Sequence, residues 1–231
     1  MTQGYNQFCP VALAAEILCT RWTVVLLREL VAGSARFNDL RRGLPRMSPA
    51  LLSQRLKELE AADIICRTPS PTEPGVFEYH LTASGRALES LIEGFGIWGQ
   101  RWIKTDTSLE QLDASLLMWD MRRNLNPTTM QKRRCVIRFQ YPELPPKQRL
   151  WWLLVDTNGE VDLCLIDPGF DVDLFVSTDL RTMTAIWMGL DNVRNAKSAK
   201  RLMLTGDRKL AADMQTWLGL SPLAKVHKLA S

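Results

Sequence analysis

The chain has 231 residues, 46% hydrophobic and 23% charged, which is enough to bury one large core or two ordinary ones. No stretch approaches the ~20 apolar residues that cross a bilayer, and no secretory signal is recognisable, so we expect a cytoplasmic protein. The five cysteines are irregularly spaced and the two histidines, His80 and His227, lie far apart. We therefore expect reduced thiols, no metal site and no cofactor.

The first helical signal runs from Val11 to Val31. Its apolar residues recur at helical spacing and predict one or two helices, with a break near Cys19-Thr20. Residues 35 to 44 predict a short amphipathic helix with Phe37 and Leu40 facing inward. The segment "GLPRM" then interrupts the chain.

A capped helix is predicted to begin at Ser48-Pro49. A serine hydroxyl can accept a hydrogen bond from a free N–H of the first turn, and proline at the first helical position loses no hydrogen bond. Leu52, Leu56 and Leu59 lie on one side of this helix and predict a buried stripe. A helix, a tight turn and a second, capped helix form a helix-turn-helix pattern.

The other side of the predicted helix has small residues first, then hydrogen-bonding side chains and cations. This order suits a helix whose N-terminal turns enter the major groove while its cations hold phosphates. From Ser34 to Lys57 there are six basic residues against one acidic residue, Asp39. The alternative is an ordinary solvated helix face. The DNA-binding residues that we predict are Arg46, Ser48, Pro49, Ala50, Ser53, Gln54, Arg55 and Lys57.

A hairpin and a long helix follow. Strands are predicted near Ile64 to Thr68 and Val76 to Leu81, with a Pro/Gly/Ser/Thr tip, so the hairpin is a candidate wing and Arg67 its DNA-contacting cation. The next helix begins with Thr82 or Ser84 as its cap. Its apolar stripe is rich in aromatic residues, and we interpret it as a dimer interface rather than as intramolecular core. The predicted interface residues are Phe95, Trp98 and Trp102.

The N-terminal half closely resembles the HxlR family of bacterial winged-helix regulators. The resemblance covers about residues 5 to 103 and is carried by "FCPVALAAEILCTRWTVVLLREL", "RFNDLRRGLPRMSPALLSQRLKELE" and "YHLTASGRAL". It implies a homodimer that binds an inverted-repeat operator of double-stranded DNA through residues 48 to 57. In some members the cysteine of the "CP" motif, here Cys9, senses oxidants or electrophiles. The alternative is that Cys9 only packs against the dimer partner.

The C-terminal half predicts an α+β layer. Residues 135–141 and 172–179 alternate as strands, and "LWWLLVDTNGEVDLCLIDPG" is a hairpin with Asn158-Gly159 at its tip. A helix begins near Thr178 or Asp179, "AKRLMLTGD" gives a short strand, and "RKLAADMQTWLGLS" a last helix. The expected order is helix, three strands, helix, strand, helix.

This half resembles the sterol carrier protein-like lipid-binding domain. The residues that carry the resemblance are "VDLCLIDPGFDVDLFVSTDLRTMTAIWMG" and "RLMLTGDRKLAADMQTWLGLS", and it covers about residues 115 to 221. It implies a hydrophobic tunnel for a lipid-like, steroid-like or aromatic molecule, although the polar "LDNVRNAKSAK" departs from the pattern. Large apolar residues suit such a cavity, and an ordinary core is the alternative. The predicted effector-binding residues are Trp151, Trp152, Phe170, Phe175, Met183, Trp187 and Met188.

Together these patterns predict a winged helix-turn-helix DNA-binding and dimerisation domain at residues 1–104. A sterol carrier-like ligand-binding domain is predicted at residues 105–231. No catalytic motif is recognisable, so we expect no enzyme. The expected function is a DNA-binding transcriptional regulator controlled by a small hydrophobic effector. The alternatives are a redox or electrophile sensor acting through Cys9, and a lipid carrier with a non-functional DNA-binding domain.

Overall fold

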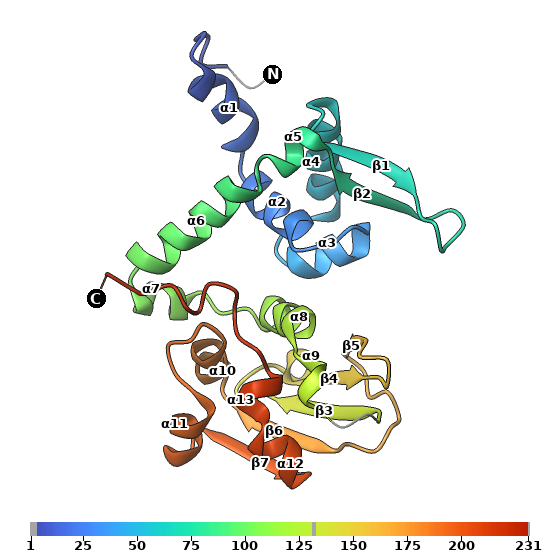
Figure 1. The fold of residues 1–231 in the computed structure, drawn as a ribbon, viewed down its shortest axis with the longest axis vertical. Helices are drawn as coiled ribbons and strands as arrows, with labels where there is room; N and C mark the ends of the chain where they lie inside the picture. Colours follow the sequence, from blue (N-terminus) through green and yellow to red (C-terminus); the bar gives the residue numbers. More distant parts are fainter. Residues whose placement is uncertain (1–3, 131–132, 231) are drawn as a thin grey trace. The chain divides into compact units, whose positions relative to one another are not determined.

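The computed structural model describes residues 4–130 and 133–230. The chain divides into two compact units, Met1–Gly96 and Ile97–Ser231, which we describe separately (Figure 1). The division falls inside one helix, α6 (Glu89–Trp102). The boundary expected from composition, at residue 104, lies just after this helix.

The first unit begins with helices α1 (Pro10–Leu18), α2 (Thr23–Val31), α3 (Phe37–Gly43) and α4 (Pro49–Ala61). The break expected near Cys19-Thr20 is confirmed: Trp22, with φ of 80°, ends the link between α1 and α2.

In the part of the chain that is described, no single helix is long and apolar enough to span a membrane. The bent pair α1 and α2 meets that criterion by length and composition.

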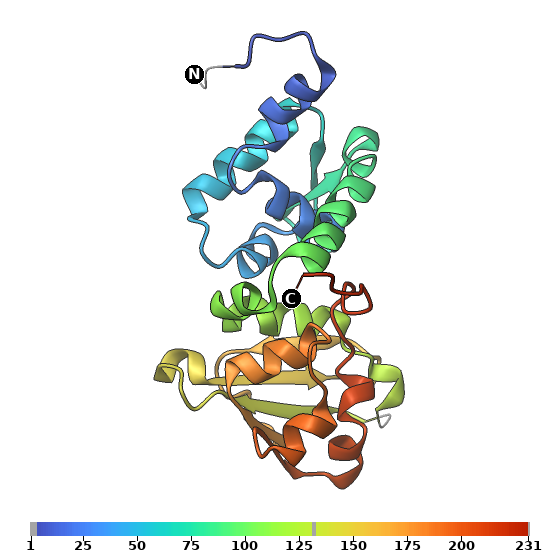
Figure 2. The same cartoon turned by 90° about the vertical axis from the view of Figure 1, so that its left-hand side faces the viewer.

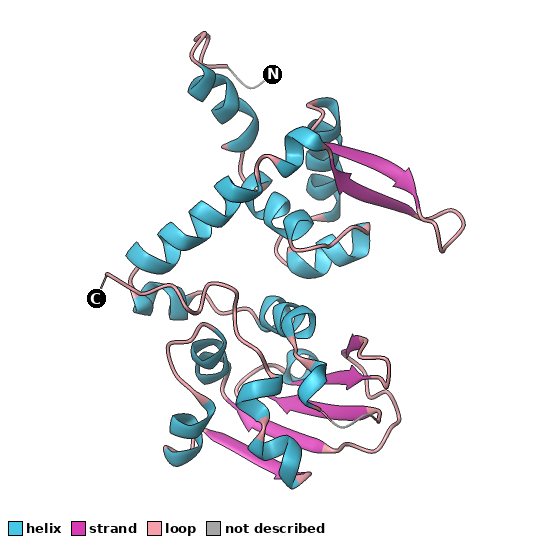
Figure 3. Ribbon diagram, in the orientation of Figure 1, coloured by secondary structure: helices cyan, strands magenta, loops and turns pink. Residues whose placement is uncertain are grey.

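The hairpin consists of β1 (Ile65–Pro69) and β2 (Phe77–Leu81), which are antiparallel, with Ile65 opposite Leu81 and Pro69 opposite Phe77. Figure 3 shows the two strands projecting from the helices of this unit. The chain then forms α5 (Ala83–Arg86), whose cap is Thr82: its hydroxyl accepts a hydrogen bond from the Gly85 N–H at 3.2 Å.

The core of the first unit joins the helices to the base of the hairpin. The expected stripe on α4 is confirmed, because Leu52, Leu56 and Leu59 are each at most 2% exposed. They belong to one cluster with buried residues of α2, α3 and β1: Leu26, Leu27, Leu30, Leu40 and Ile65. This packing fixes which side of α4 faces the solvent.

Gly85 is held by a close backbone approach. A Cβ atom at this position would lie 2.1 Å from the carbonyl oxygen of Ile64, which also accepts a hydrogen bond from the Thr82 N–H. We expect Gly85→Ala to lower the free energy of unfolding by about 1–3 kcal/mol, because the backbone at Ile64 must move to make room for the new Cβ atom. Gly94→Ala on α6 is the matched control, since nothing lies within 4 Å of its Cβ position. It should be neutral or gain up to about 1 kcal/mol. Urea denaturation of both variants tests this, and equal stability would contradict it.

The second unit contains a five-stranded sheet in the order β5-β4-β3-β6-β7. The strands β3 and β6 are parallel and the other pairs antiparallel. Four strands, not the expected three, precede the next long helix, because the predicted hairpin contributes two; its turn at Gly159 has a φ of 86°. The strands are β3 (Cys135–Gln140), β4 (Leu150–Val155), β5 (Val161–Cys164), β6 (Leu174–Thr178) and β7 (Leu202–Gly206).

The helices of this unit include several that the sequence patterns did not separate. The polar stretch "LDNVRNAKSAK" contains α11, capped by Asn192, and the expected last helix is two short ones that meet at Asp213. The bounds are α7 (Thr105–Glu110), α8 (Ala114–Asn124), η1 (Pro127–Thr129), α9 (Pro146–Arg149), α10 (Leu180–Trp187), α11 (Val193–Ser198), α12 (Arg208–Ala212) and α13 (Met214–Trp217).

Alternating strand residues form the core of this unit together with its helices. Ile137 and Phe139 of β3 are fully buried, and they share one cluster with Met118 of α8, Met183 of α10 and Trp217 of α13. Figure 2 shows the orange α10 lying against the sheet. The predicted α+β layer is therefore present.

Candidate nucleic-acid interface

The N-terminus of α4 is built as the serine-proline pair predicts. The Ser48 hydroxyl accepts a hydrogen bond from the Leu51 N–H at 3.3 Å, and Pro49 occupies the first helical position. In the turn before it, the Met47 N–H donates to the Leu44 carbonyl at 2.9 Å, and both side chains are buried. The buried turn and the cap together set where α4 starts and how its first turn is presented.

The solvent side of α4 begins with small residues. Ser48, Pro49 and Ala50 are exposed, and so are Gln54 and Lys57 further along. No acidic residue lies in the first turn of the helix. A narrow, non-acidic helix end of this kind can enter a major groove, which is about 12 Å wide.

Glu58 organises the middle of this surface. Its carboxylate accepts a hydrogen bond from the Gln54 side chain at 2.9 Å and pairs with Arg55. Partial burial raises the pKa of Glu58, but the hydrogen bonds from Gln54 and Arg55 outweigh it and the pKa is lowered. Gln54 and Arg55, which we predicted to contact DNA, are therefore both bound to the Glu58 carboxylate.

Arg55 also points away from the open side of α4. Its Nε donates to the Arg21 carbonyl at 3.3 Å, and its side chain is only 14% exposed. Ser53 is likewise half-buried. Of the predicted residues on the body of α4, Lys57 is the cation that remains on the exposed side.

The hairpin supplies a second exposed edge. The Arg67 guanidinium lies over the Phe77 ring, 3.7 Å from its centroid, and both side chains are exposed. This stacking holds the cation along the hairpin while leaving its N–H groups able to bind phosphate.

In the folded structure, acidic side chains neutralise part of the positive charge of residues 34 to 57. Several of the cations in this window have acidic partners: Arg36 pairs with Glu73 and Glu78, Arg42 with Asp39, and Arg55 with Glu58. Three of those four carboxylates come from outside the window. Arg41, Arg46 and Lys57 are the other cations of this window, and all three are exposed. No local pattern in the sequence indicates the partners of Arg36.

The aromatic stripe on α6 is open to solvent. Phe95, Trp98 and Trp102 are 60%, 61% and 53% exposed, and Leu91 continues the same line. These residues are spaced four, three and four apart, which places them on one side of a helix. Large exposed apolar patches mark interaction surfaces in soluble proteins.

Cys9 is the N-cap of α1, with Pro10 at the first helical position. Hydrogen bonding to the backbone of Ala12, and then of Val11, lowers the pKa of the Cys9 thiol. Burial raises the pKa of the Cys135 thiol instead. Cys9 is therefore the more readily ionised thiol of the two.

The structure brings only some of the seven predicted effector residues together: Trp151, Met183 and Trp187 share one core cluster, and Met188 packs against it. Trp151 and Trp152 are neighbours on β4, so they point to opposite faces of the sheet. Trp151, Met183 and Trp187 are buried in the core, and Trp152 is also buried. Phe175 and Met188 are half-buried, and Phe170 is 44% exposed beneath the Arg134 guanidinium.

A pocket of about 520 Å³ lies elsewhere in the second unit, beside α11 and α12. None of the seven predicted residues lines it; its lining is Asn192, Val193, Arg194, Lys197, Ser198, Ala211, Ala212 and Gln215. Among the residues that the structure describes, no group of three or more His, Cys, Asp or Glu side chains could hold a metal ion.

Known proteins match the first unit. A model of the HxlR-like helix-turn-helix family matches residues 17–107. The HTH-type transcriptional regulator YvaP of Bacillus subtilis is 36% identical over 99 residues, which are 42% of this chain and 92% of YvaP. The chain belongs to the HxlR family. It is a DNA-binding transcriptional regulator with a winged helix-turn-helix at its N-terminus, as the sequence resemblance predicted.

Other relatives match the same region. YodB of Bacillus subtilis is 32% identical over 108 residues, which are 46% of this chain and 96% of YodB. The solved structure of reduced YodB is 30% identical, covering 42% of this chain and 97% of YodB, with a TM-score of 0.37. The redox regulator HypR in its reduced form is 33% identical, covering 39% of this chain and 90% of HypR, also with a TM-score of 0.37.

Proposed function

We propose that this HxlR-family regulator binds an inverted-repeat operator as a homodimer, with the first turns of α4 in the major groove and the hairpin β1–β2 as the wing. The observation that carries the proposal is the exposed, acid-free first turn of α4 beside exposed cations. Ser48, Pro49 and Ala50 would lie nearest the bases. Arg46, Lys57 and Arg67 would hold phosphates. Gln54 and Arg55 would have to leave Glu58 before they could contact DNA.

Lys57 offers a direct test of phosphate contact. We expect Lys57→Gln to weaken binding to all duplexes similarly and to reduce the slope of log affinity against log salt by about 1, because one released counterion is lost. Lys147→Gln, a matched change on exposed α9 in the second unit, should leave the slope unchanged. Fluorescence-anisotropy titrations at four salt concentrations measure both. Equal slopes for the two variants would contradict a role for Lys57 at the backbone.

The dimer proposal is supported by the stripe on α6. Four large apolar side chains on one helix face are costly to leave in water, and a second copy of the same helix would cover them. In a two-fold dimer, each copy of this small domain would read one of the two half-sites of an inverted repeat.

We also propose Cys9 as a thiol sensor that controls DNA binding. Its lowered pKa favours the reactive thiolate. YodB, a relative by sequence, has been solved in diamide-treated and quinone-bound forms. Cys9→Ser should abolish any change in DNA affinity caused by diamide or quinones. A response that persists in Cys9→Ser would remove this proposal.

The order of thiol reactivity can be measured first. We expect iodoacetamide at pH 7 to alkylate Cys9 at least about tenfold faster than Cys135, because a lowered pKa gives more thiolate and burial hinders Cys135. Peptide mass spectrometry after timed quenching reports both rates. Raising the pH should narrow the difference between the two alkylation rates, because Cys9 becomes fully ionised at a lower pH than Cys135. Equal rates at pH 7 would contradict the lowered pKa of Cys9.

The proposal of a hydrophobic effector in the second unit rests on the sterol carrier resemblance. A ligand placed among Trp151, Met183 and Trp187 would have to displace closely packed side chains. Titration with lipids, steroids and aromatic acids, followed by tryptophan fluorescence and by operator affinity, tests it. A flat response in both signals would exclude effector binding by these compounds.

A further inference from the structure

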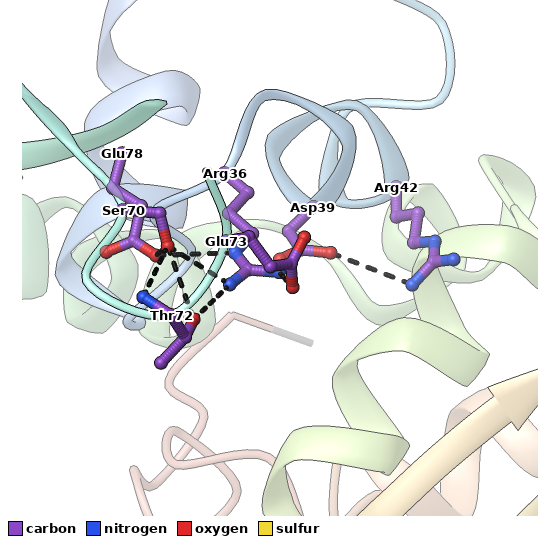
Figure 4. Close-up of polar contacts among 7 residues, drawn as sticks. All are labelled: Arg36, Asp39, Arg42, Ser70, Thr72, Glu73 and Glu78. Atoms are coloured by element: carbon purple, nitrogen blue, oxygen red, sulfur yellow. Dashed lines mark hydrogen bonds and ion pairs between the residues drawn. The ribbon is translucent and has the colours of Figure 1, made fainter. Parts of the chain in front are cut away.

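Arg36 is the N-cap residue of α3, but its side chain binds residues of the hairpin. The guanidinium reaches Glu73 at 2.5 Å through Nη1 and Glu78 at 3.3 Å through Nε. Its remaining nitrogen, Nη2, is within 3.1 Å of the Thr72 hydroxyl and 3.4 Å of the Ser70 hydroxyl. All three nitrogens of the fork are thus used, as Figure 4 shows.

The tip of the hairpin, residues 70–76, is folded around this guanidinium. The Ser70 hydroxyl donates to the Glu78 carboxylate at 2.8 Å, and the Ser70 N–H donates to the Val76 carbonyl at 2.8 Å. The Val76 N–H donates to the Glu73 carbonyl at 3.2 Å. The tip is a closed polar loop with a cation from another element at its centre.

A backbone contact brings the two elements together at the same place. Arg36 forms an isolated antiparallel bridge with Glu78, and the Tyr79 N–H donates to the Ala35 carbonyl at 2.8 Å. The side chain of Arg36 is 33% exposed and that of Glu78 only 15%, so their pairing is partly shielded from water. The planar guanidinium can meet several acceptors at once, which a lysine cannot do.

The charge of the hairpin shows why a counter-ion is needed there. Residues 65–81 contain two carboxylates, Glu73 and Glu78, against the single permanent cation Arg67. Duplex DNA carries one negative charge per about 1.7 Å of its axis. An acidic hairpin would therefore be repelled from the surface that a wing has to approach.

We propose that Arg36 is the positioning residue of the wing: it closes the tip and, together with Arg67, balances the Glu73 and Glu78 charges, so that the hairpin can lie against DNA. Arg36 itself does not contact phosphate in this arrangement, although it belongs to the basic stretch before α4. The inference rests on the proposed function for the approach of the wing to DNA, but not for the closed tip.

The closed tip is tested without DNA by hydrogen exchange. In Arg36→Gln we expect amides of residues 70–76 to exchange at least about tenfold faster, while the 49–61 segment is unchanged. Arg42→Gln is the matched control, because Arg42 pairs with Asp39 on its own helix at 3.6 Å. Unchanged exchange at the tip in Arg36→Gln would overturn the proposal.

The charge effect is tested by DNA affinity in a variant series. We expect Arg36→Gln to bind about tenfold more weakly than wild type, and the triple variant Arg36→Gln/Glu73→Gln/Glu78→Gln to recover to within about twofold. Failure of the triple variant to recover would show that the Glu73 and Glu78 charges do not cause the loss, which overturns the charge part of the proposal. An unchanged affinity in Arg36→Gln would also overturn it. Wild-type binding in the same titration reports separately on the proposed function.

Discussion

Replacing Ala50 with glutamate should lower the affinity for duplex DNA by at least about a hundredfold, because like charges brought into contact at an interface cost several kcal/mol. Ala50 is exposed in the first turn of α4, where we propose that the helix enters the groove. The longer side chain also widens a helix end that is now formed by small residues. Anisotropy titration at about 50 mM salt, where binding is strongest, measures the loss.

The same substitution should not harm the fold. A carboxylate in the first turn interacts favourably with the helix dipole, so Ala50→Glu should gain about 0.3–1 kcal/mol of unfolding free energy. Ala61→Glu is the matched control, since Ala61 is exposed at the last residue of the same helix. Its DNA affinity should stay within about threefold of wild type. Similar losses in both variants would mean that the start of α4 has no special place at the interface.

Replacing Trp98 with glutamate should convert the dimer to monomers and remove tight binding to an inverted repeat. Trp98 is 61% exposed on α6, in line with Phe95 and Trp102. Truncating a central aromatic residue of an interface costs about 2 kcal/mol or more, and a buried carboxylate costs further. Dimerisation should therefore weaken by at least about thirtyfold in sedimentation equilibrium.

Glu93→Lys is the control for this prediction. Glu93 is exposed on α6, about 200° around the helix from Leu91, so it lies opposite the stripe. The Glu93→Lys variant should remain dimeric, although this substitution changes the charge of the helix more than Trp98→Glu does. A Trp98→Glu variant that stays dimeric and keeps full affinity would show that the stripe has another role.

Local signals in the sequence predicted most of the first unit. The Ser48-Pro49 pair determines the start of α4 through bonds within one turn, and the leucine spacing determines its buried side. The Asn158-Gly159 turn was equally local. The helix α11 was missed although its signals were present, namely the cap Asn192 and the buried pair Val193 and Ala196.

The partners of the charged residues could not be predicted in this way. Arg36 and Glu78 are 42 residues apart in sequence, and only the folded hairpin brings them together. Arg55 sits among groove-facing residues in the sequence, yet a carbonyl 34 residues away and Glu58 turn it aside. The aromatic residues of the second unit illustrate a different limit, because core and ligand cavity use the same side chains. Trp151 and Trp187 proved to be core, and their predicted role with an effector remains a prediction.

The most direct test of DNA recognition through α4 is selection of DNA fragments by the full-length protein. Genomic fragments should be incubated with wild-type protein and with Ala50→Glu at about 50 mM salt, and the bound DNA sequenced. We predict that wild-type protein enriches fragments sharing two inverted half-sites whose centres lie about one helical turn, or a multiple of it, apart. Ala50→Glu should enrich none. Equal enrichment by both proteins, or no shared sequence with wild-type protein, would contradict the account.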